Sequence, residues 1–377
     1  MSSMILNDVL VIDFTQALAG PYCTLLLSYN GARVIKIERP ASGDMLRSAA
    51  PFTPEGLSIF WASVNSNKES CALDLKNNDD LELIKNIIRK ADILVENFRP
   101  GVMEKLGLGY DDVKKINPTI IYTSISGFGT TGPMAHEPGF YLIGQGYSGM
   151  MPINGDVDKD MGRIGFPIGD ISAGMWGYMS TMTAYCGRLK TGVGAYIDIS
   201  MLDGLFAMMP VEVTAYTKLN ELGHYTGNID PAAAPFGAIP TQDSAIIVAV
   251  LGEKLWLSFC QAVGKIEWYD DPYFKTGPDR IKNRAALQAV VQPLFKQKRT
   301  AEWQKILTDA GIPNGVINDI KQACEQPQIA ARNMLVKAGD YLVPGNPMKI
   351  SSNFEMKTFK APETIGASTD KIRKDFK

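Results

Sequence analysis

Short apolar runs rich in valine and isoleucine recur through the first half of the chain, and segments with a helical pattern separate them. The strand candidates are residues 9–12, 34–37, 93–95, 120–125 and 195–199. Between the first two, Pro21 occupies a favoured first position of a helix that Asn30 and Gly31 end. Strands that alternate with helices are typical of an α/β fold with an open, mostly parallel sheet. The first two strands should therefore run parallel, joined by a right-handed crossover.

Loops rich in glycine and proline follow these strands, at residues 15–20, 96–101 and 126–133. In open parallel sheets ligands bind beyond the carboxyl ends of the strands, so these loops are the expected binding region. The first loop contains only Gly20, whereas a dinucleotide-binding loop needs several glycines to let the backbone approach a pyrophosphate. The sequence therefore does not favour NAD as a ligand.

A single helix is predicted at residues 202–217. The polar stretch after it, residues 221–235, is rich in glycine, proline and asparagine and indicates a domain boundary. A strand candidate at residues 245–250 follows it, and three helical patterns come next, at residues 254–263, 281–295 and 300–310. This order predicts a second, smaller domain of the α+β class.

Composition and charge exclude several classes of function. The 377 residues carry a formal net charge of −2 without a basic run that contains aromatic residues, so no nucleic acid partner is expected. Five cysteines without a CxxC pair fit a reducing compartment. No signal peptide is recognised, and the apolar segment at residues 175–185 is too short to span a bilayer. We therefore expect a cytoplasmic protein with no membrane partner.

The chain has only two histidines, His136 and His224. Neither lies in a nucleophile-elbow context, and no local pattern supports a two-histidine metal site. If the protein is an enzyme, its chemistry should therefore depend on carboxylates, backbone amides or a bound cofactor, and we expect no metal.

Asp170 lies in a stretch, residues 165–174, where glycines and Pro167 precede an apolar helical segment. Two interpretations of this acid are open from the residues alone. It can be the N-cap of the helix, where backbone N–H groups lack partners. It can also be a nucleophilic carboxylate that the helix N-terminus keeps ionised.

Six separated motifs occur along essentially the whole chain, at residues 13–21, 31–38, 96–101, 126–133, 165–174 and 345–347. In this order and spacing they resemble the class III CoA-transferases, the family that includes formyl-CoA and carnitine CoA-transferases. The resemblance implies a doubly wound, Rossmann-like large domain made of residues 1–200 and 325–377. It implies a linker at residues 201–235 and a smaller α+β domain at residues 236–324. It also implies an interlocked homodimer, in which each subunit passes through a ring formed by the other.

For the chemistry, the resemblance places a nucleophile at Asp170. The enzyme would move CoA from an acyl-CoA donor to a free carboxylic acid through an aspartyl anhydride and an aspartyl-CoA thioester. A fixed, desolvated carboxylate is more reactive than one in water, and backbone N–H groups of a glycine loop can stabilise the oxyanion. CoA is then a substrate, and no cofactor is bound permanently.

For CoA binding, the resemblance carries over eight residues, namely Ala17, Leu18, Arg39, Leu73, Lys76, Asn97, Phe98 and Lys105. The basic side chains among them would pair with the CoA phosphates, and Phe98 would contact the adenine.

The sequence departs from the family pattern at three places. Tyr141 replaces an aspartate that members often carry, and residues 233–237 replace a run of glycines. Residues 48–50 are small where the formyl-CoA enzymes carry a tryptophan. These departures do not support oxalate as the acceptor and indicate room for a larger acid.

Two alternatives stay open. α-Methylacyl-CoA racemase has a similar architecture but needs a histidine just before residue 141, where this chain has Phe140, which cannot transfer a proton. A non-catalytic CoA-binding homologue is the other alternative, and the presence of Asp170 in its glycine context argues against it.

Overall fold

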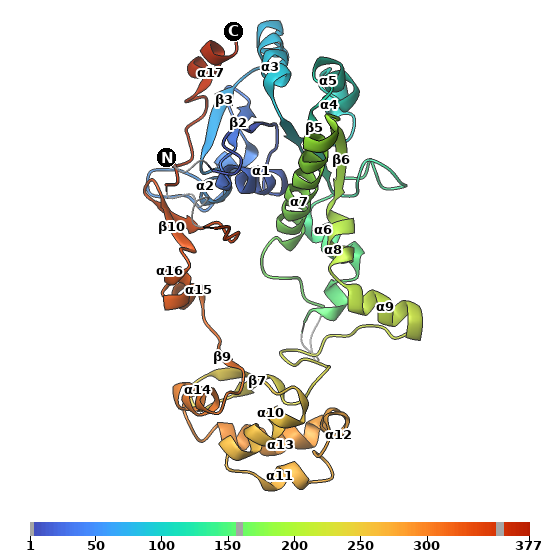
Figure 1. Ribbon diagram of the computed structural model, residues 1–377, viewed down its shortest axis with the longest axis vertical. Helices are drawn as coiled ribbons and strands as arrows, with labels where there is room; N and C mark the ends of the chain where they lie inside the picture. The colour runs from blue at the N-terminus through green and yellow to red at the C-terminus, as the bar shows by residue number, and fades with distance from the viewer. Residues whose placement is uncertain (1–3, 156–160, 352–357) are drawn as a thin grey trace. The chain divides into compact units, whose positions relative to one another are not determined.

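The computed structural model describes residues 4–155, 161–351 and 358–377 (Figure 1). The chain divides into two compact units. The first consists of Met1–Met151, Arg163–Leu222 and Pro327–Lys377, and the second consists of Pro152–Gly162 and Gly223–Gln326. The first unit thus continues through two helices, α8 (Met201–Ala207) and α9 (Pro210–Leu219), which lie in the segment predicted as a linker.

The first unit is built on a six-stranded sheet in the order β3-β2-β1-β4-β5-β6, and every neighbouring pair is parallel. The strands are β1 (Leu10–Asp13), β2 (Arg33–Glu38), β3 (Lys68–Ala72), β4 (Ile93–Glu96), β5 (Ile121–Ser126) and β6 (Ala195–Ser200). The prediction of a parallel sheet is therefore confirmed. The strand order reverses between β1 and β4, and such a switch point is where sheets of this kind bind ligands.

Alternate residues of a strand point to opposite faces of the sheet, and in these strands both sets are apolar. Helices therefore cover both faces. Val11, Val34 and Ile93 share one core with the helices α1 (Ala19–Tyr29) and α7 (Ile168–Thr191). On the other face, Ile12 and Leu94 share a second core with α3 (Asn78–Lys90), α5 (Tyr110–Ile116) and the C-terminal α17 (Thr369–Asp375). In Figure 1, α1 and α7 can be followed beside the strands.

Smaller elements complete the first unit. They are α2 (Ile59–Val64), α4 (Val102–Lys105), α6 (Tyr141–Ser148), α16 (Pro327–Ala331), the antiparallel pair β10 (Leu335–Ala338) and β11 (Tyr341–Pro344), and a short 3₁₀ turn, Met45–Ser48. A second 3₁₀ turn, Met151–Ile153, contains residues of both units. The Tyr29 hydroxyl donates to the Pro344 carbonyl (3.1 Å), and Asn346 donates to the Tyr29 carbonyl (3.4 Å). These bonds fasten the C-terminal segment to α1.

The helix α7 has 24 residues and extends beyond the predicted segment, 175–185, at both ends. It begins at Ile168, with Pro167 as the N-cap, so Asp170 is the third helical residue. The interpretation of Asp170 as the N-cap was wrong, because the helix starts directly after the proline, where its fixed φ is already compatible with helical geometry. Neither α7 nor any other helix in the described ranges is long and apolar enough to cross a membrane.

Two further sequence predictions differ from the structure. The strand β3 (KESCA) was not predicted, because three of its five residues are polar and it has no run of β-branched residues. One of the polar residues, Lys68, is nevertheless buried. The single helix predicted at residues 202–217 is two helices, since Pro210 starts α9 anew.

The second unit contains an antiparallel sheet in the order β7-β8-β9 and six helices among its described residues. The elements are β7 (Phe236–Pro240), β8 (Ala245–Ala249), β9 (Asn314–Val316), α10 (Gly252–Ala262), α11 (Glu267–Asp270), α12 (Gly277–Lys282), α13 (Arg284–Phe295), α14 (Thr300–Asp309) and α15 (Ile320–Cys324). Its core is a row of stacked rings, Trp256, Phe259, Phe295 and Trp303. The helix predicted at residues 281–295 is interrupted at Asn283.

Candidate active site

A cleft of about 930 Å³ lies beyond the carboxyl ends of β1, β2, β3 and β4 in the first unit. Five of the residues predicted to bind CoA line it, namely Arg39, Leu73, Lys76, Phe98 and Lys105. They come from loops up to 66 positions apart in the chain (Lys105 minus Arg39), and the parallel sheet brings them together because all these strands end at the same edge.

The cleft carries a clear excess of positive charge. Arg39, Lys76, Arg99 and Lys105 line it, and none of the four forms an ion pair within the part of the chain that the structure describes. Of the two acids on its wall, Glu38 is already paired with Arg47 at 2.7 Å, and Asp74 accepts the backbone N–H of Lys76. Unpaired cations at the ends of parallel strands suit a ligand with several phosphate groups.

A second cavity of about 250 Å³ contains Asp170. Gln16, Phe98 and Arg99 line both this cavity and the larger cleft, so a ligand in the cleft can extend to Asp170. Two more predicted residues, Ala17 and Asn97, line the cavity. Leu18 lines neither space, because its side chain packs against a separate apolar cluster with Leu25 and Val343.

The first loop is held in place by Asn97. The Asn97 side chain accepts from the Gln16 N–H and donates to the Gln16 carbonyl, both at 2.7 Å. The chain can turn back into α1 this closely because Gly20 has no side chain: a Cβ there would lie 2.4 Å from the Thr15 side chain. The lone glycine of the first loop therefore serves close packing.

Asp170 is positioned by α6, which packs against the start of α7. Gln145 of α6 is fully buried and accepts the N–H of Ile164 at 2.9 Å, which holds the segment leading into α7. Gly169 lies against the backbone of Tyr141, where a Cβ would come within 3.1 Å of it. This contact, rather than access to a ligand, explains the glycine before the acid. It also places Tyr141 next to the candidate nucleophile.

Burial raises the pKa of Asp170 to about 6, although the backbone N–H groups of Ala19 and Asp170 itself act to lower it. The sequence suggested that the helix N-terminus would keep this acid ionised. In the structure burial outweighs the N–H groups, because a partly desolvated carboxylate loses more hydration than two N–H groups replace. At pH 7 the group is still mostly ionised, and it is less solvated than an ordinary aspartate.

Residues 137–140, which directly precede α6, also line the cavity of Asp170. His136 is exposed and is not among the residues that line this cavity. In the described ranges, no group of three histidine, cysteine, aspartate or glutamate side chains could hold a metal ion.

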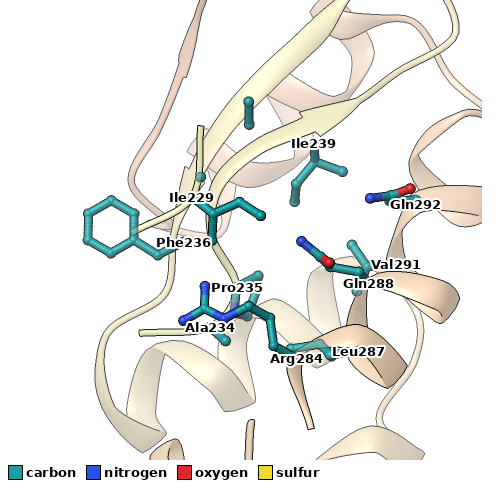
Figure 2. Close-up of a pocket in the computed structure, with 12 residues that line it drawn as sticks. Ile229, Ala234, Pro235, Phe236, Ile239, Arg284, Leu287, Gln288, Val291 and Gln292 are labelled. Atoms are coloured by element: carbon teal, nitrogen blue, oxygen red, sulfur yellow. The ribbon is translucent and has the colours of Figure 1, made fainter. Parts of the chain in front are cut away.

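A further cavity, of about 40 Å³, lies in the second unit between β7 and α13 (Figure 2). Gln288 and Gln292 of α13 reach toward Ile239, and Arg284 is bound to the carbonyls of Asp230 and Pro231 at 2.8 and 3.0 Å. The volume suits a few water molecules rather than a substrate.

Several lining residues were not among the predicted ones. Gln16, Met45, Arg99 and Met201 line the Asp170 cavity. Arg99 directly follows Asn97 and Phe98 in the motif at 96–101, so adjacency in the sequence could have identified it. Met201 gave no such signal, because only the end of β6 brings it to the site.

Fold and site together define an α/β protein with a cationic binding cleft at the switch point of a parallel sheet and a partly desolvated aspartate beside it. Comparison with known proteins gives the family. The sequence matches CoA-transferase family III over residues 6–369. It is 37% identical to acetyl-CoA:oxalate CoA-transferase from Acetobacter aceti over 371 residues, which cover 98% of this chain and 95% of that protein.

Two other similarities agree with this result. The succinyl-CoA:glutarate CoA-transferase of Mus musculus is 32% identical over 375 residues, covering 98% of this chain and 86% of that protein. The crystal structure of a CaiB/BaiF family protein from Brucella suis superposes with a TM-score of 0.90 at 29% identity, covering all of both chains. The chain belongs to CoA-transferase family III and is a CoA-transferase, as the motifs indicated.

Proposed function

We propose that the protein transfers CoA between an acyl-CoA and a free carboxylate with Asp170 as the covalent nucleophile. The main support for this proposal is that the cationic cleft adjoins the cavity of Asp170. Gln16, Phe98 and Arg99 line both. A CoA molecule bound in the cleft would extend its thioester toward that carboxylate.

In the first half of the proposed reaction, a carboxylate oxygen of Asp170 attacks the thioester carbonyl carbon. The C–O bond forms, the C–S bond breaks, and CoA leaves as the thiolate, which gives an acyl-aspartyl anhydride. The thiolate then attacks the Asp170 carbonyl carbon and expels the donor acid as its carboxylate. The product is an aspartyl-CoA thioester.

In the second half, the acceptor carboxylate attacks the aspartyl-CoA thioester and again releases the CoA thiolate. The thiolate attacks the acceptor carbonyl carbon of the new anhydride, which forms the product acyl-CoA and frees Asp170. No net proton transfer is needed, which agrees with the lining of the cavity, where Phe140 stands in place of a histidine. The raised pKa of Asp170 supports a desolvated nucleophile that is ionised at neutral pH.

For CoA, we propose that Arg39, Lys76 and Lys105 pair with the phosphates and that Phe98 contacts the adenine. Leu73 lies on the same wall, and Ala17 and Asn97 would contact the thioester end. Leu18 could take part only through its backbone, since its side chain packs elsewhere.

For the acceptor, we propose a short dicarboxylic acid. The names of similar proteins contain oxalate, glutarate and mesaconate, all of them dicarboxylates. The cavity near Asp170 contains one basic side chain, Arg99, among mostly apolar neighbours. That composition fits an acid with a carbon chain and a second charged end better than a monocarboxylate.

We further propose that the protein is the interlocked homodimer that the family resemblance implies. The support is an apolar helix face: Met175, Trp176 and Met179 of α7 are 36–46% exposed. Phe206 at the end of α8 and Val211 on α9 are exposed as well. Apolar side chains that gather in this way mark a protein–protein contact more often than a solvated surface.

The proposed function is tested by incubating the purified protein with a panel of acyl-CoA donors and free short dicarboxylates, oxalate included, in D₂O. Mass spectrometry of the products reports both transfer and exchange. New acyl-CoA from at least one dicarboxylate is the expected result. Deuterium at the α-carbon of the donor without transfer would instead establish a racemase. Binding of acyl-CoA with neither reaction across the panel would establish a CoA-binding protein without this activity.

A further inference from the structure

Three consecutive residues of the first loop are each held by a side chain from another part of the unit. Lys36 of β2 donates to the Thr15 carbonyl at 2.6 Å. Asn97 binds both backbone groups of Gln16. Asp44 accepts the Ala17 N–H at 3.1 Å. In the loop that lines the Asp170 cavity, the backbone of each of these three residues is therefore held by a hydrogen bond to a distant side chain.

Two of these holding residues form a buried ion pair. Lys36 Nζ and Asp44 Oδ2 are 3.1 Å apart, and each side chain is only 1% exposed. Around the pair lie further charged groups, namely Asp13, Lys68, Glu38 and Arg47. Burying an ion pair costs hydration that mutual attraction barely recovers, so an apolar pair of the same size is often equally stable. Stability of the core alone thus does not account for the pair.

Ala17 is the residue that most needs such support. Its φ of +62° lies in the left-handed region, which a residue with a Cβ adopts only when its surroundings impose it. The Asp44 carboxylate supplies that constraint, because it accepts the N–H groups of both Ala17 and Leu46. Because a residue with a Cβ is more stable at negative φ, loss of this acceptor should let Ala17 leave the left-handed region.

Ala17 lies two residues before Ala19, where α1 begins. The Ala19 N–H acts to lower the pKa of Asp170, and Ala17 and Asp170 line the same cavity. We propose that Asp44, held by Lys36, is a positioning residue for Asp170: it fixes Ala17 so that the Ala19 N–H and the cavity wall stay aligned with the nucleophile. This inference rests on the proposed role of Asp170.

The double substitution Lys36→Met with Asp44→Leu tests the proposal, since it removes both charges together and leaves no buried charge unpaired. We expect a folded protein whose kcat falls about 10- to 100-fold, as a small misplacement at a reacting group can cause. The KM for acyl-CoA should change far less than kcat. The acid limb of the pH–kcat profile should move to higher pH, because Asp170 loses an N–H partner.

The matched variant, Lys36→Met with Asp44→Asn, also leaves no buried charge unpaired but keeps an oxygen for the Ala17 N–H, so it should retain most of the activity and the original pH midpoint. The charged groups lining the cavity of Asp170, Arg99 and Glu137, are unchanged in both variants. A folded double variant with the wild-type kcat and pH midpoint would overturn the proposal. So would a loss of kcat with an unmoved midpoint.

Hydrogen exchange of the wild-type protein gives a check that does not depend on a variant folding. The Ala17 amide should be protected, since it donates to a buried carboxylate, and exchange at the rate of an open loop would refute the proposal. Wild-type protein is also treated with acyl-CoA and hydroxylamine. If no adduct forms at Asp170, the proposed function fails; if it forms while the variants behave as wild type, only the positioning role fails.

Discussion

Gly174 of α7 lies so close to Ala19 of α1 that a Cβ at Gly174 would stand 2.6 Å from the Ala19 carbonyl oxygen. Gly174 is one helical turn after Asp170, on the side of α7 that faces α1. The close approach of the two helices places Ala19, whose N–H acts to lower the pKa of Asp170, beside α7. The glycine four residues after the acid thus has a positional role in the site.

Replacing Gly174 with alanine should push α1 and α7 apart. We expect a loss of about 1–3 kcal/mol in the free energy of unfolding, typical of overpacking, and a clear decrease in kcat. Denaturant unfolding and transfer rates measure the two effects. Gly187→Ala on the same helix is the control, because nothing lies within 4 Å of a Cβ there. It should leave activity unchanged and stabilise the helix slightly, by about 0.5–1 kcal/mol. Equal behaviour of the two variants would contradict the packing account.

Much of the sheet could be predicted from the sequence, because β1, β2, β4, β5 and β6 are short runs of β-branched residues. The strand β3 could not, since Lys68 is buried through an ion pair with Asp13 at 3.2 Å. That pairing joins residues 55 positions apart (68 minus 13) and leaves no local signal. The extent of α7 was underestimated for a similar reason: its first turn contains glycine and aspartate, which are weak helix formers stabilised here by packing against α1 and α6.

The pH dependence of transfer should follow the ionisation of Asp170. The pKa of this carboxyl in the free protein is raised by burial to about 6, so kcat/KM should increase with pH through a midpoint near that value and then level off. Values of kcat/KM between about pH 4 and about pH 8, roughly two units to either side of the expected midpoint, provide the measurement. A midpoint near the ordinary aspartate value would contradict the desolvated state of the nucleophile.

Replacing Asp170 with asparagine should increase the free energy of unfolding at high pH and leave it unchanged at low pH. The folded pKa of Asp170 is above its ordinary value of 3.8, so folding favours the protonated form, and that stabilisation is lost as pH rises through about 6. Asparagine mimics the neutral acid. The variant should therefore be more stable than wild type at pH 8, by up to roughly 3 kcal/mol, and equal to it near pH 4. Chemical unfolding at both pH values measures this, and a destabilised variant at pH 8 would count against the account.

The cations of the cleft should control the affinity for CoA. Arg39→Ala and Lys105→Ala should each raise the KM for acyl-CoA about 5- to 30-fold, corresponding to the loss of about 1–2 kcal/mol of phosphate pairing. Added salt should raise the wild-type KM and affect the variants less. Lys305→Ala on α14 of the second unit is the control, since this lysine is largely exposed and pairs with Asp309. A KM unchanged in both cleft variants would place CoA elsewhere.

The apolar face of α7 should be part of a subunit contact. Met179→Glu places a charge on this face, at a side chain that is 43% exposed in the single chain. Light scattering should find a dimer for wild type and dissociation or poor assembly for the variant, because an unpaired buried charge opposes association. Gln304→Glu, at an exposed position of α14, serves as the charge-matched comparison. A monomeric wild-type protein would remove the dimer proposal.

The site was predictable to the extent that its residues lie in contiguous motifs. Asp170, Arg39 and Phe98 could be named from such stretches, and the structure places them around connected spaces. The ion pair of Lys36 with Asp44 and the raised pKa of Asp170 could not be predicted, because both depend on burial by segments distant in the sequence.

The central claim is that Asp170 becomes covalently acylated, and direct trapping tests it. The protein is incubated with a donor acyl-CoA, treated with hydroxylamine, digested and analysed by mass spectrometry. We predict a hydroxamate on Asp170 that requires acyl-CoA and is missing from Asp170→Ala, whose transfer rate should be lower by at least about 1,000-fold. A hydroxamate on another residue, or an Asp170→Ala variant that transfers CoA at the wild-type rate, would contradict the account.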